Sequence, residues 1–176
     1  MQIVAISGSL RLASINTQLL YATQSVAPPS LKIEIFNGIG DLPHFNPDRE
    51  SDYPLAVSVW RDAVRDTDAV IFSTPEYAHG LPGSLKNALD WLVGSGELAN
   101  KPFALFNTSP RGTFAQASLT EIVSTMAGRH VRSADVTLFL QRSTNEDALT
   151  LTPEQTEAVR AALETLRRAC EGKSLI

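Results

Sequence analysis

The feature that most constrains the fold of this chain is a repeated alternation of short apolar runs with longer segments of helical periodicity. The apolar runs occupy residues 3–6, 31–36, 69–72, 103–106 and 136–140. The first, third and fourth runs are apolar throughout, which is typical of strands covered on both faces of a parallel sheet. Parallel strands need long crossover connections between them, and these are usually helices. The pattern therefore predicts an α/β protein whose parallel sheet carries helices on both faces.

The predicted helices occupy residues 15–26, 54–66, 82–93, 115–126 and 153–170. Two of them begin at Pro54 and Pro82, since proline is favoured at a first helical position. The last has the clearest start, because Thr152 can cap it, Pro153 opens it and Gln155 completes a capping box.

Composition narrows the class of protein further. The chain has 176 residues, 43% hydrophobic and 19% charged, which predicts one globular domain over residues 1–176. A net charge of −4 argues against a nucleic-acid binder, and no apolar stretch approaches the ~20 residues that span a bilayer. The N-terminus shows no secretory signal, no Cys/His cluster has zinc spacing and Cys170 is the only cysteine. We therefore expect a cytoplasmic protein without a metal site.

Ligands of doubly wound sheets bind beyond the carboxyl ends of the strands, which directs attention to three loops. The first loop and the helix start behind it carry hydroxyls, an amide and a guanidinium at Ser9, Arg11, Ser14, Asn16 and Thr17. Such donors at a helix N-terminus suit a phosphate group. The loop lacks the glycines of the dinucleotide fingerprint and the ending of a P-loop. From this loop alone, an ordinary turn with a serine cap is an equally good interpretation.

The second loop, residues 73–83, contains two prolines and two glycines. Proline stiffens a loop and glycine lets the backbone approach a ligand closely. Tyr77 and His79 offer planar surface and polar edges at the mouth of the sheet. The alternative interpretation is a rigid turn with an exposed tyrosine, followed by a helix that only packs.

Residues 8–16 and 75–91 together resemble the GSLRxxSxN and PEYxxGxPGxLKNAxDW signatures of the NADPH-dependent FMN reductases. That family includes FMN, quinone, azo-dye and chromate reductases. The resemblance implies a flavodoxin-like three-layer sandwich with a five-stranded parallel sheet in the order 2-1-3-4-5. It also implies FMN as cofactor, with NADPH or NADH as hydride donor.

The same resemblance implies the roles of individual residues. The FMN phosphate would be held by Ser9, Arg11, Ser14, Asn16 and Thr17. The rest of the flavin would be lined by Pro75, Glu76, Tyr77 and Gly80, with His79 as a polar contact and with Ser109 and Gly112 from the third loop. Two departures are Ala78, where many members have asparagine, and Pro110-Arg111, which replace paired glycines. Arg11 and Arg111 are candidate partners for the 2′-phosphate of NADPH.

The expected function is an NAD(P)H oxidoreductase that passes hydride through FMN to free flavin, a quinone, an azo compound or a metal oxyanion. No catalytic side chain is expected, because the flavin carries the chemistry. One alternative is a non-enzymatic flavodoxin-type electron carrier. Such carriers typically have a strongly acidic surface for docking redox partners, and a net charge of −4 does not supply it. Another is a phosphate-binding regulatory module. The resemblance also implies a homodimer or homotetramer, and our choice for the subunit contact is the helix after the second loop, with Trp91 and Leu92.

Overall fold

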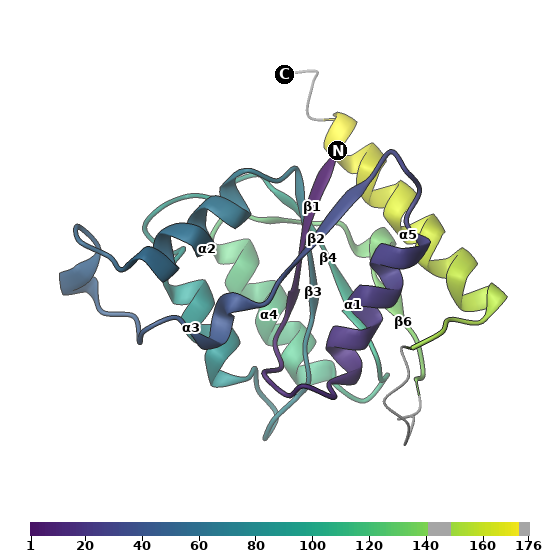
Figure 1. Cartoon of the computed structure of the whole chain (residues 1–176), viewed down its shortest axis with the longest axis horizontal. Coiled ribbons are helices and arrows are strands. Elements are labelled where there is room, and N and C mark those ends of the chain that lie inside the picture. The colour runs from purple at the N-terminus through teal and green to yellow at the C-terminus, as the bar shows by residue number, and fades with distance from the viewer. Residues whose placement is uncertain (141–148, 173–176) are drawn as a thin grey trace.

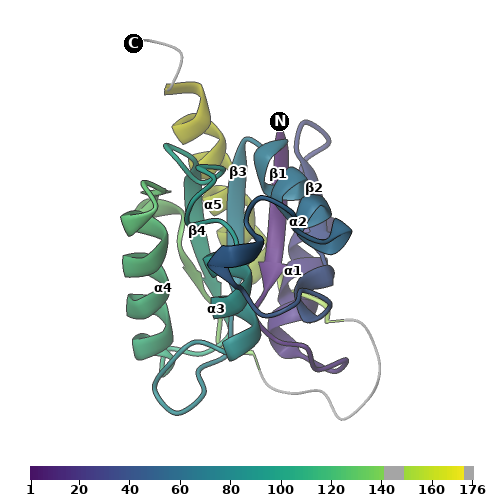
Figure 2. The ribbon, with the colours of Figure 1, turned by 90° about the vertical axis from the view of Figure 1, so that its left-hand side faces the viewer.

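The computed structural model describes residues 1–140 and 149–172, and it shows a parallel sheet between two layers of helices (Figures 1 and 2). The strands are β1 (Gln2–Ser7), β2 (Lys32–Phe36), β3 (Ala69–Ser73), β4 (Pro102–Asn107), β5 (Arg129–His130) and β6 (Val136–Thr137). The α-helices are α1 (Ile15–Val26), α2 (Leu55–Arg65), α3 (Gly83–Asp90), α4 (Thr113–Thr125) and α5 (Pro153–Glu171). Short 3-10 helices are η1 (Gly38–Gly40), η2 (Pro47–Arg49) and η3 (Arg132–Ala134).

The strand order β2-β1-β3-β4-β5 confirms the predicted 2-1-3-4-5 arrangement. Alternate residues of β1 serve opposite faces of the sheet, as the pleat requires. Ile3 and Ala5 belong to the core beneath α1 and α5, whereas Val4 and Ile6 belong to the core beneath α2, α3 and α4. Because both faces are covered, the central strands are apolar throughout.

One strand was predicted at residues 136–140, but the structure has two short strands beside β4 in its place. These are β5, which pairs with Pro102 and Phe103, and β6, which pairs with Phe106 and Asn107. Between the two pieces, the N–H of Leu105 donates to Oδ1 of Asp135 at 2.8 Å. A side chain therefore takes the backbone hydrogen bond that a continuous strand would have made, and within the described residues the sheet has six strands instead of five.

The predicted helix ends are largely confirmed. The capping box of α5 is present, with Gln155 N donating to Thr152 Oγ1 at 3.2 Å and Thr152 N donating to Gln155 Oε1 at 3.0 Å. Pro54 and Pro82 lie one position earlier than predicted, since both are N-caps and not first helical residues. Within the described residues, no helix is both long and apolar enough to cross a membrane.

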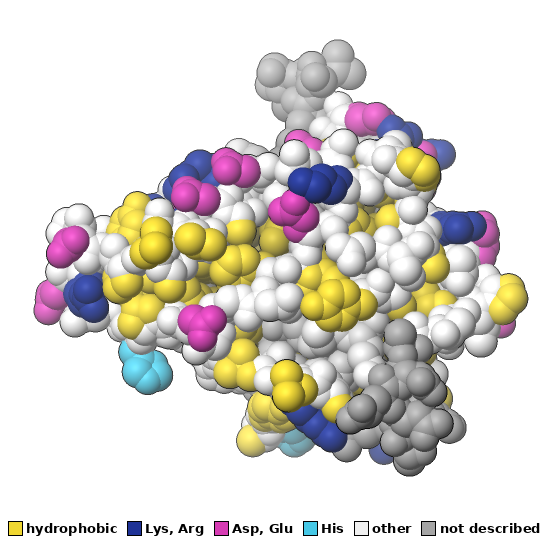
Figure 3. Space-filling model, viewed as in Figure 1, with side chains coloured by type: hydrophobic (Ala, Val, Ile, Leu, Met, Phe, Trp, Pro, Cys, Tyr) yellow, Lys and Arg dark blue, Asp and Glu magenta, His cyan; other side chains and the backbone are white. Residues whose placement is uncertain are grey.

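Trp91 and Leu92, named with the helix chosen for the subunit contact, are not available for such a contact. Their exposed fractions are only 3% and 1%, and Trp91 Nε1 donates to the carbonyl of Pro43 at 2.9 Å. Both side chains fill the core of their own chain. The apolar patch at the left of Figure 3 lies over α2, where Leu55 and Val59 are exposed.

Candidate functional site

A cavity of about 380 Å³ lies at the carboxyl ends of β1, β3 and β4. The predicted site residues that line it are Ser9, Arg11, Ser14, Asn16, Pro75, Glu76, Tyr77, Ser109 and Gly112. The lining residues that had not been assigned to the flavin are Ile15, Thr74, Asn107, Thr108, Arg111 and Gln116. Three loops that are far apart in sequence therefore meet at this edge of the sheet, as the topology predicted. Figure 3 shows cationic, histidine and apolar side chains together at this lower edge.

The β1–α1 loop presents hydrogen-bond donors at a helix end. Ser14 caps α1, since its Oγ accepts from Thr17 N at 3.4 Å. The backbone N–H groups of Ile15 and Asn16 belong to the first turn, where no intrahelical acceptor exists. Ser9 Oγ accepts from Arg11 N at 3.3 Å, which holds this hydroxyl and the arginine on the same turn. An anion at this position meets hydroxyl, backbone and guanidinium donors together.

Asn16 and Thr17 serve the scaffold more than the first loop alone suggests. Asn16 is buried, and its Oδ1 accepts from Ser73 Oγ at 3.1 Å and from Thr108 Oγ1 at 3.2 Å. This side chain therefore joins α1 to the ends of β3 and β4. Thr17 lines a neighbouring pocket that shares Ser9 and Arg11 with this cavity, and its Oγ1 lies 2.7 Å from Ser7 Oγ.

Gly8 lets the first two loops approach each other. Its N–H donates to the carbonyl of Ser73 at 2.8 Å, and a Cβ at this position would lie 2.2 Å from Thr74 Oγ1. Since Thr74 lines the cavity, any larger residue at position 8 would displace part of the cavity wall.

The second loop contains a two-residue turn in an uncommon conformation. Tyr77 and Gly80 exchange two backbone hydrogen bonds of 3.0 Å, while Ala78 and His79 have φ angles of 50° and 61°. Positive φ at both central positions is the geometry of a type I′ turn, which glycine and asparagine normally supply. The turn places the His79 ring against Phe114, with ring centroids 4.3 Å apart. His79 and Gly80 are therefore not among the residues that line the cavity.

Glu76 connects the second loop to the third. Its Oε2 accepts from Ala115 N at 2.9 Å, in the first turn of α4. The N-cap of α4 is Gly112, which has no side chain to cap the helix, so a carboxylate from another loop supplies the acceptor. The family resemblance implied Glu76 as a flavin contact, whereas its bond to α4 depends on tertiary structure.

The chemistry of these residues fits FMN. The wall at α1 supplies hydroxyls, unpaired N–H groups and a guanidinium, which suit a phosphate. The wall after β3 supplies Pro75 and the ring of Tyr77, which is 57% exposed and offers a flat surface to a conjugated ring. We find no side chain in the cavity lining that obstructs this assignment chemically.

Comparison with known proteins gives curated relatives that are named quinone reductases. The 2-hydroxy-1,4-benzoquinone reductase of Burkholderia sp is 38% identical over 112 residues, which are 62% of this chain and 61% of that protein. The quinone reductase of Escherichia coli (strain K12) is 36% identical over 121 residues, which are 66% of this chain and 64% of that protein. The matches thus span less than two thirds of the length of these curated relatives.

Solved structures and a family-wide sequence model extend the likeness over the whole fold. FerB, a flavoenzyme NAD(P)H:(acceptor) oxidoreductase from Paracoccus denitrificans, is 28% identical with a TM-score of 0.72, covering 96% of this chain and 98% of that chain. The sequence model of the NADPH-dependent FMN reductases matches residues 1–169. The chain belongs to the family of NADPH-dependent FMN reductases.

Proposed function

We propose that this protein is an FMN-dependent NAD(P)H oxidoreductase that passes hydride from NADPH through FMN to a small acceptor such as a quinone. The observation that carries the proposal is the cavity itself, which the donors at the start of α1 and the exposed Tyr77 line together at the ends of three strands. Family membership and the names of the quinone and FMN reductase relatives support it. We further propose that residues 1–176 form one FMN-binding domain.

In this proposal the residues of the chain bind and orient FMN, and they contribute no nucleophile or proton shuttle. The side chains of Ser9, Arg11 and Ser14 hold the phosphate, which fixes one end of the cofactor. Glu76 keeps the third loop beside the second through its bond to α4. Bound FMN supplies the acceptance and release of hydride.

The mouth of the cavity suits small planar acceptors. Tyr77 of the second loop lines the cavity and is 57% exposed, and Phe114 of α4, 54% exposed, stacks on His79 of the same loop. Exposed aromatic faces favour flat conjugated molecules by stacking. Quinones and free flavins meet this requirement, so we place them first among the acceptors.

Purified protein reconstituted with FMN tests the proposal directly. We expect flavin absorption bands that remain after gel filtration, bleach on anaerobic addition of NADPH, and return when a quinone such as menadione is added. Steady-state NADPH oxidation should then require the quinone. A protein that keeps FMN but does not turn over NADPH without a separate reductase would be an electron carrier. A protein that never acquires flavin bands would refute FMN binding.

We also propose that the protein assembles as a homodimer or homotetramer and resides in the cytoplasm, as the sequence analysis expected. The exposed side chains of Leu55, Val59 and Val93 supply apolar surface for such a contact. Light scattering coupled to gel filtration gives the mass, and a mass near 19.1 kDa would contradict the proposed assembly.

A further inference from the structure

Of the lining residues that the structure describes, two are arginines and one carries a carboxylate. Arg11 enters from the β1–α1 loop and Arg111 from the β4–α4 loop, and both are exposed. Among the described residues, neither guanidinium forms an ion pair. The carboxylate of Glu76 accepts from the N–H of Ala115. An overall acidic protein thus keeps excess positive charge in this cavity, which favours ligands with more than one anionic group.

The two arginines share one local arrangement. Ser9 Oγ accepts from Arg11 N at 3.3 Å, and Ser109 Oγ accepts from Arg111 N at 3.2 Å. Each loop therefore brings a serine hydroxyl and a guanidinium to the cavity, two residues apart. A guanidinium can contact a phosphate through two parallel N–H groups.

The helix behind each arginine differs, and this distinguishes the two places. The cap of α1 is the neutral hydroxyl of Ser14, whereas the cap of α4 is the carboxylate of Glu76, which places a negative charge at that helix start. The Arg11 side therefore suits the phosphate of the more deeply held ligand. At the Arg111 side this negative charge opposes an anion at the helix start, so a phosphate there depends on the side chains of Ser109 and Arg111, which suits a group that enters and leaves with a diffusing ligand.

The proposed function supplies a ligand with such a group, and the inference rests on that function. FMN has one phosphate, which the α1 side accommodates. NADPH differs from NADH by a phosphomonoester on the 2′-oxygen of its adenosine ribose. We propose that Arg111 binds the 2′-phosphate of NADPH and thereby makes the protein prefer NADPH to NADH.

Nucleotide fragments test this binding without turnover. Calorimetric titration of the FMN-loaded protein with adenosine 2′,5′-bisphosphate and with adenosine 5′-monophosphate isolates the 2′-phosphate. We expect Arg111→Ala to weaken binding of the bisphosphate by roughly 10- to 100-fold, as loss of a charged hydrogen bond does, and to leave the monophosphate within about 2-fold. Arg111→Lys keeps the charge without the planar fork and should fall between these values. The KM for NADPH should rise by the same factor as the bisphosphate Kd, while the KM for NADH stays constant.

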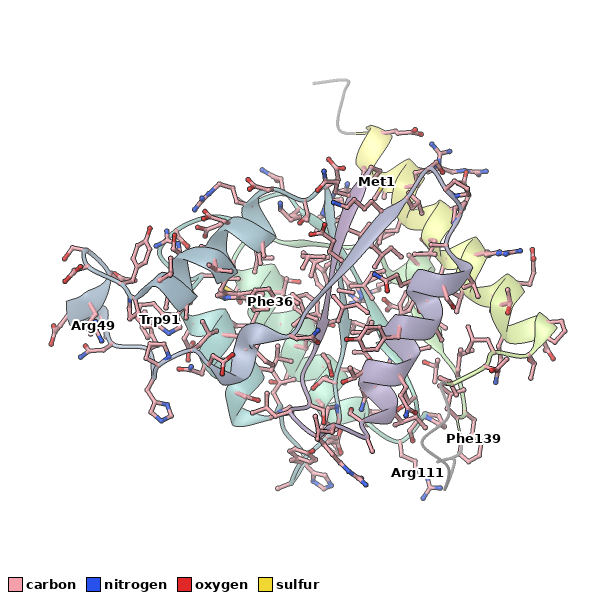
Figure 4. All side chains as sticks on the ribbon, in the orientation of Figure 1. Met1, Phe36, Arg49, Trp91, Arg111 and Phe139 are labelled. Carbon is pink, nitrogen blue, oxygen red and sulfur yellow. The ribbon has the colours of Figure 1, made fainter. Side chains whose placement is uncertain are left out.

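Arg49→Ala is the matched control. Arg49 is also exposed and without an ion pair among the described residues, but it lies on η2 at the far left of Figure 4, away from Arg111 at the lower edge. It should leave binding of both nucleotides unchanged, which separates the local contact from a general loss of positive charge.

Three results would overturn the inference. If Arg111→Ala weakened binding of the bisphosphate and of the monophosphate by the same factor, the arginine would contact a part of the nucleotide that both ligands share. Weaker FMN binding with unchanged bisphosphate binding would assign it to the flavin. If Arg49→Ala and Arg111→Ala weakened binding of the bisphosphate equally, the effect would come from the net charge of the protein and not from a local contact. In all three cases the flavin bands of the native protein should still bleach with NADPH; if they do not, the proposed function itself fails.

Discussion

We expect Lys101→Met to lower the free energy of unfolding by about 3–5 kcal/mol, because it removes a charged donor that is hydrogen-bonded to three backbone carbonyl groups. Lys101 is buried just before β4, and its Nζ donates to carbonyl oxygens at the end of α2. The distances are 2.6 Å to Val64 O and 3.1 Å to Arg65 O, and a third bond joins Nζ to Thr67 O. Methionine fills most of the same volume but leaves these carbonyls without the ammonium group.

The effect should be large in ordinary unfolding experiments. For a chain of this size each kcal/mol shifts the melting temperature by about 2–4 °C, so the expected loss is roughly 6–20 °C. With a urea m-value of about 2 kcal/mol/M, the midpoint should fall by roughly 1.5–2.5 M at unchanged slope. Circular dichroism during urea titration measures both quantities.

Lys86→Met is the control, since it makes the same chemical change on the surface. Lys86 forms an exposed pair with Asp90 at 2.5 Å, four residues further along the chain, and such pairs contribute about 0.5 kcal/mol or less. If Lys101→Met cost no more than Lys86→Met, the carbonyl network at the end of α2 would not stabilise the fold, and our reasoning would be wrong.

Three further predictions concern the site and the surrounding fold. Arg11→Ala should weaken FMN binding by about 1.5–3 kcal/mol in a fluorescence titration, and unchanged affinity would remove Arg11 from the site. Gly8→Ala should cost about 1–3 kcal/mol in urea unfolding because its Cβ would overlap Thr74, and a neutral result would show that the loop shifts freely. Burial opposes ionisation of Glu97, but hydrogen bonds from Ser95 and Arg61 outweigh it and lower the pKa of this carboxyl below 4.5. The unfolded state therefore binds more protons than the folded state, so Glu97 stabilises the fold above pH 4.5. This contribution is lost as the pH falls through the lower pKa of the folded state. Glu97→Gln should therefore flatten the acid side of a curve of unfolding free energy against pH, and an unchanged slope would refute this.

The sequence predicted the arrangement of sheet and helices well, because the spacing of apolar residues along the chain follows which side chains are buried. Strands β1, β3 and β4 are covered on both faces, and their apolar runs show it directly. The split of the last strand was not predictable in this way. It depends on Asp135 reaching the N–H of Leu105, thirty residues earlier, and no local pattern encodes that contact.

The candidate site was predictable as three loops, but not as a connected structure. Topology alone places the ends of β1, β3 and β4 together, so most lining residues were found. The bond from Glu76 to Ala115 and the approach of Gly8 to Thr74 join loops that are distant in sequence. His79 was assigned to the flavin by position, whereas the positive φ angles of the turn bring its ring to Phe114.

The interruption of the edge strand at Asp135 affects how readily chains can associate through this margin of the sheet. Strands with a long row of free backbone groups at a sheet margin recruit other chains into intermolecular β-structure. Here β5 and β6 contain two residues each, so neither offers enough consecutive backbone groups to template such growth. At the opposite margin, β2 carries the charged pair Lys32 and Glu34. Both margins of the sheet are thereby protected against fibril-like self-association.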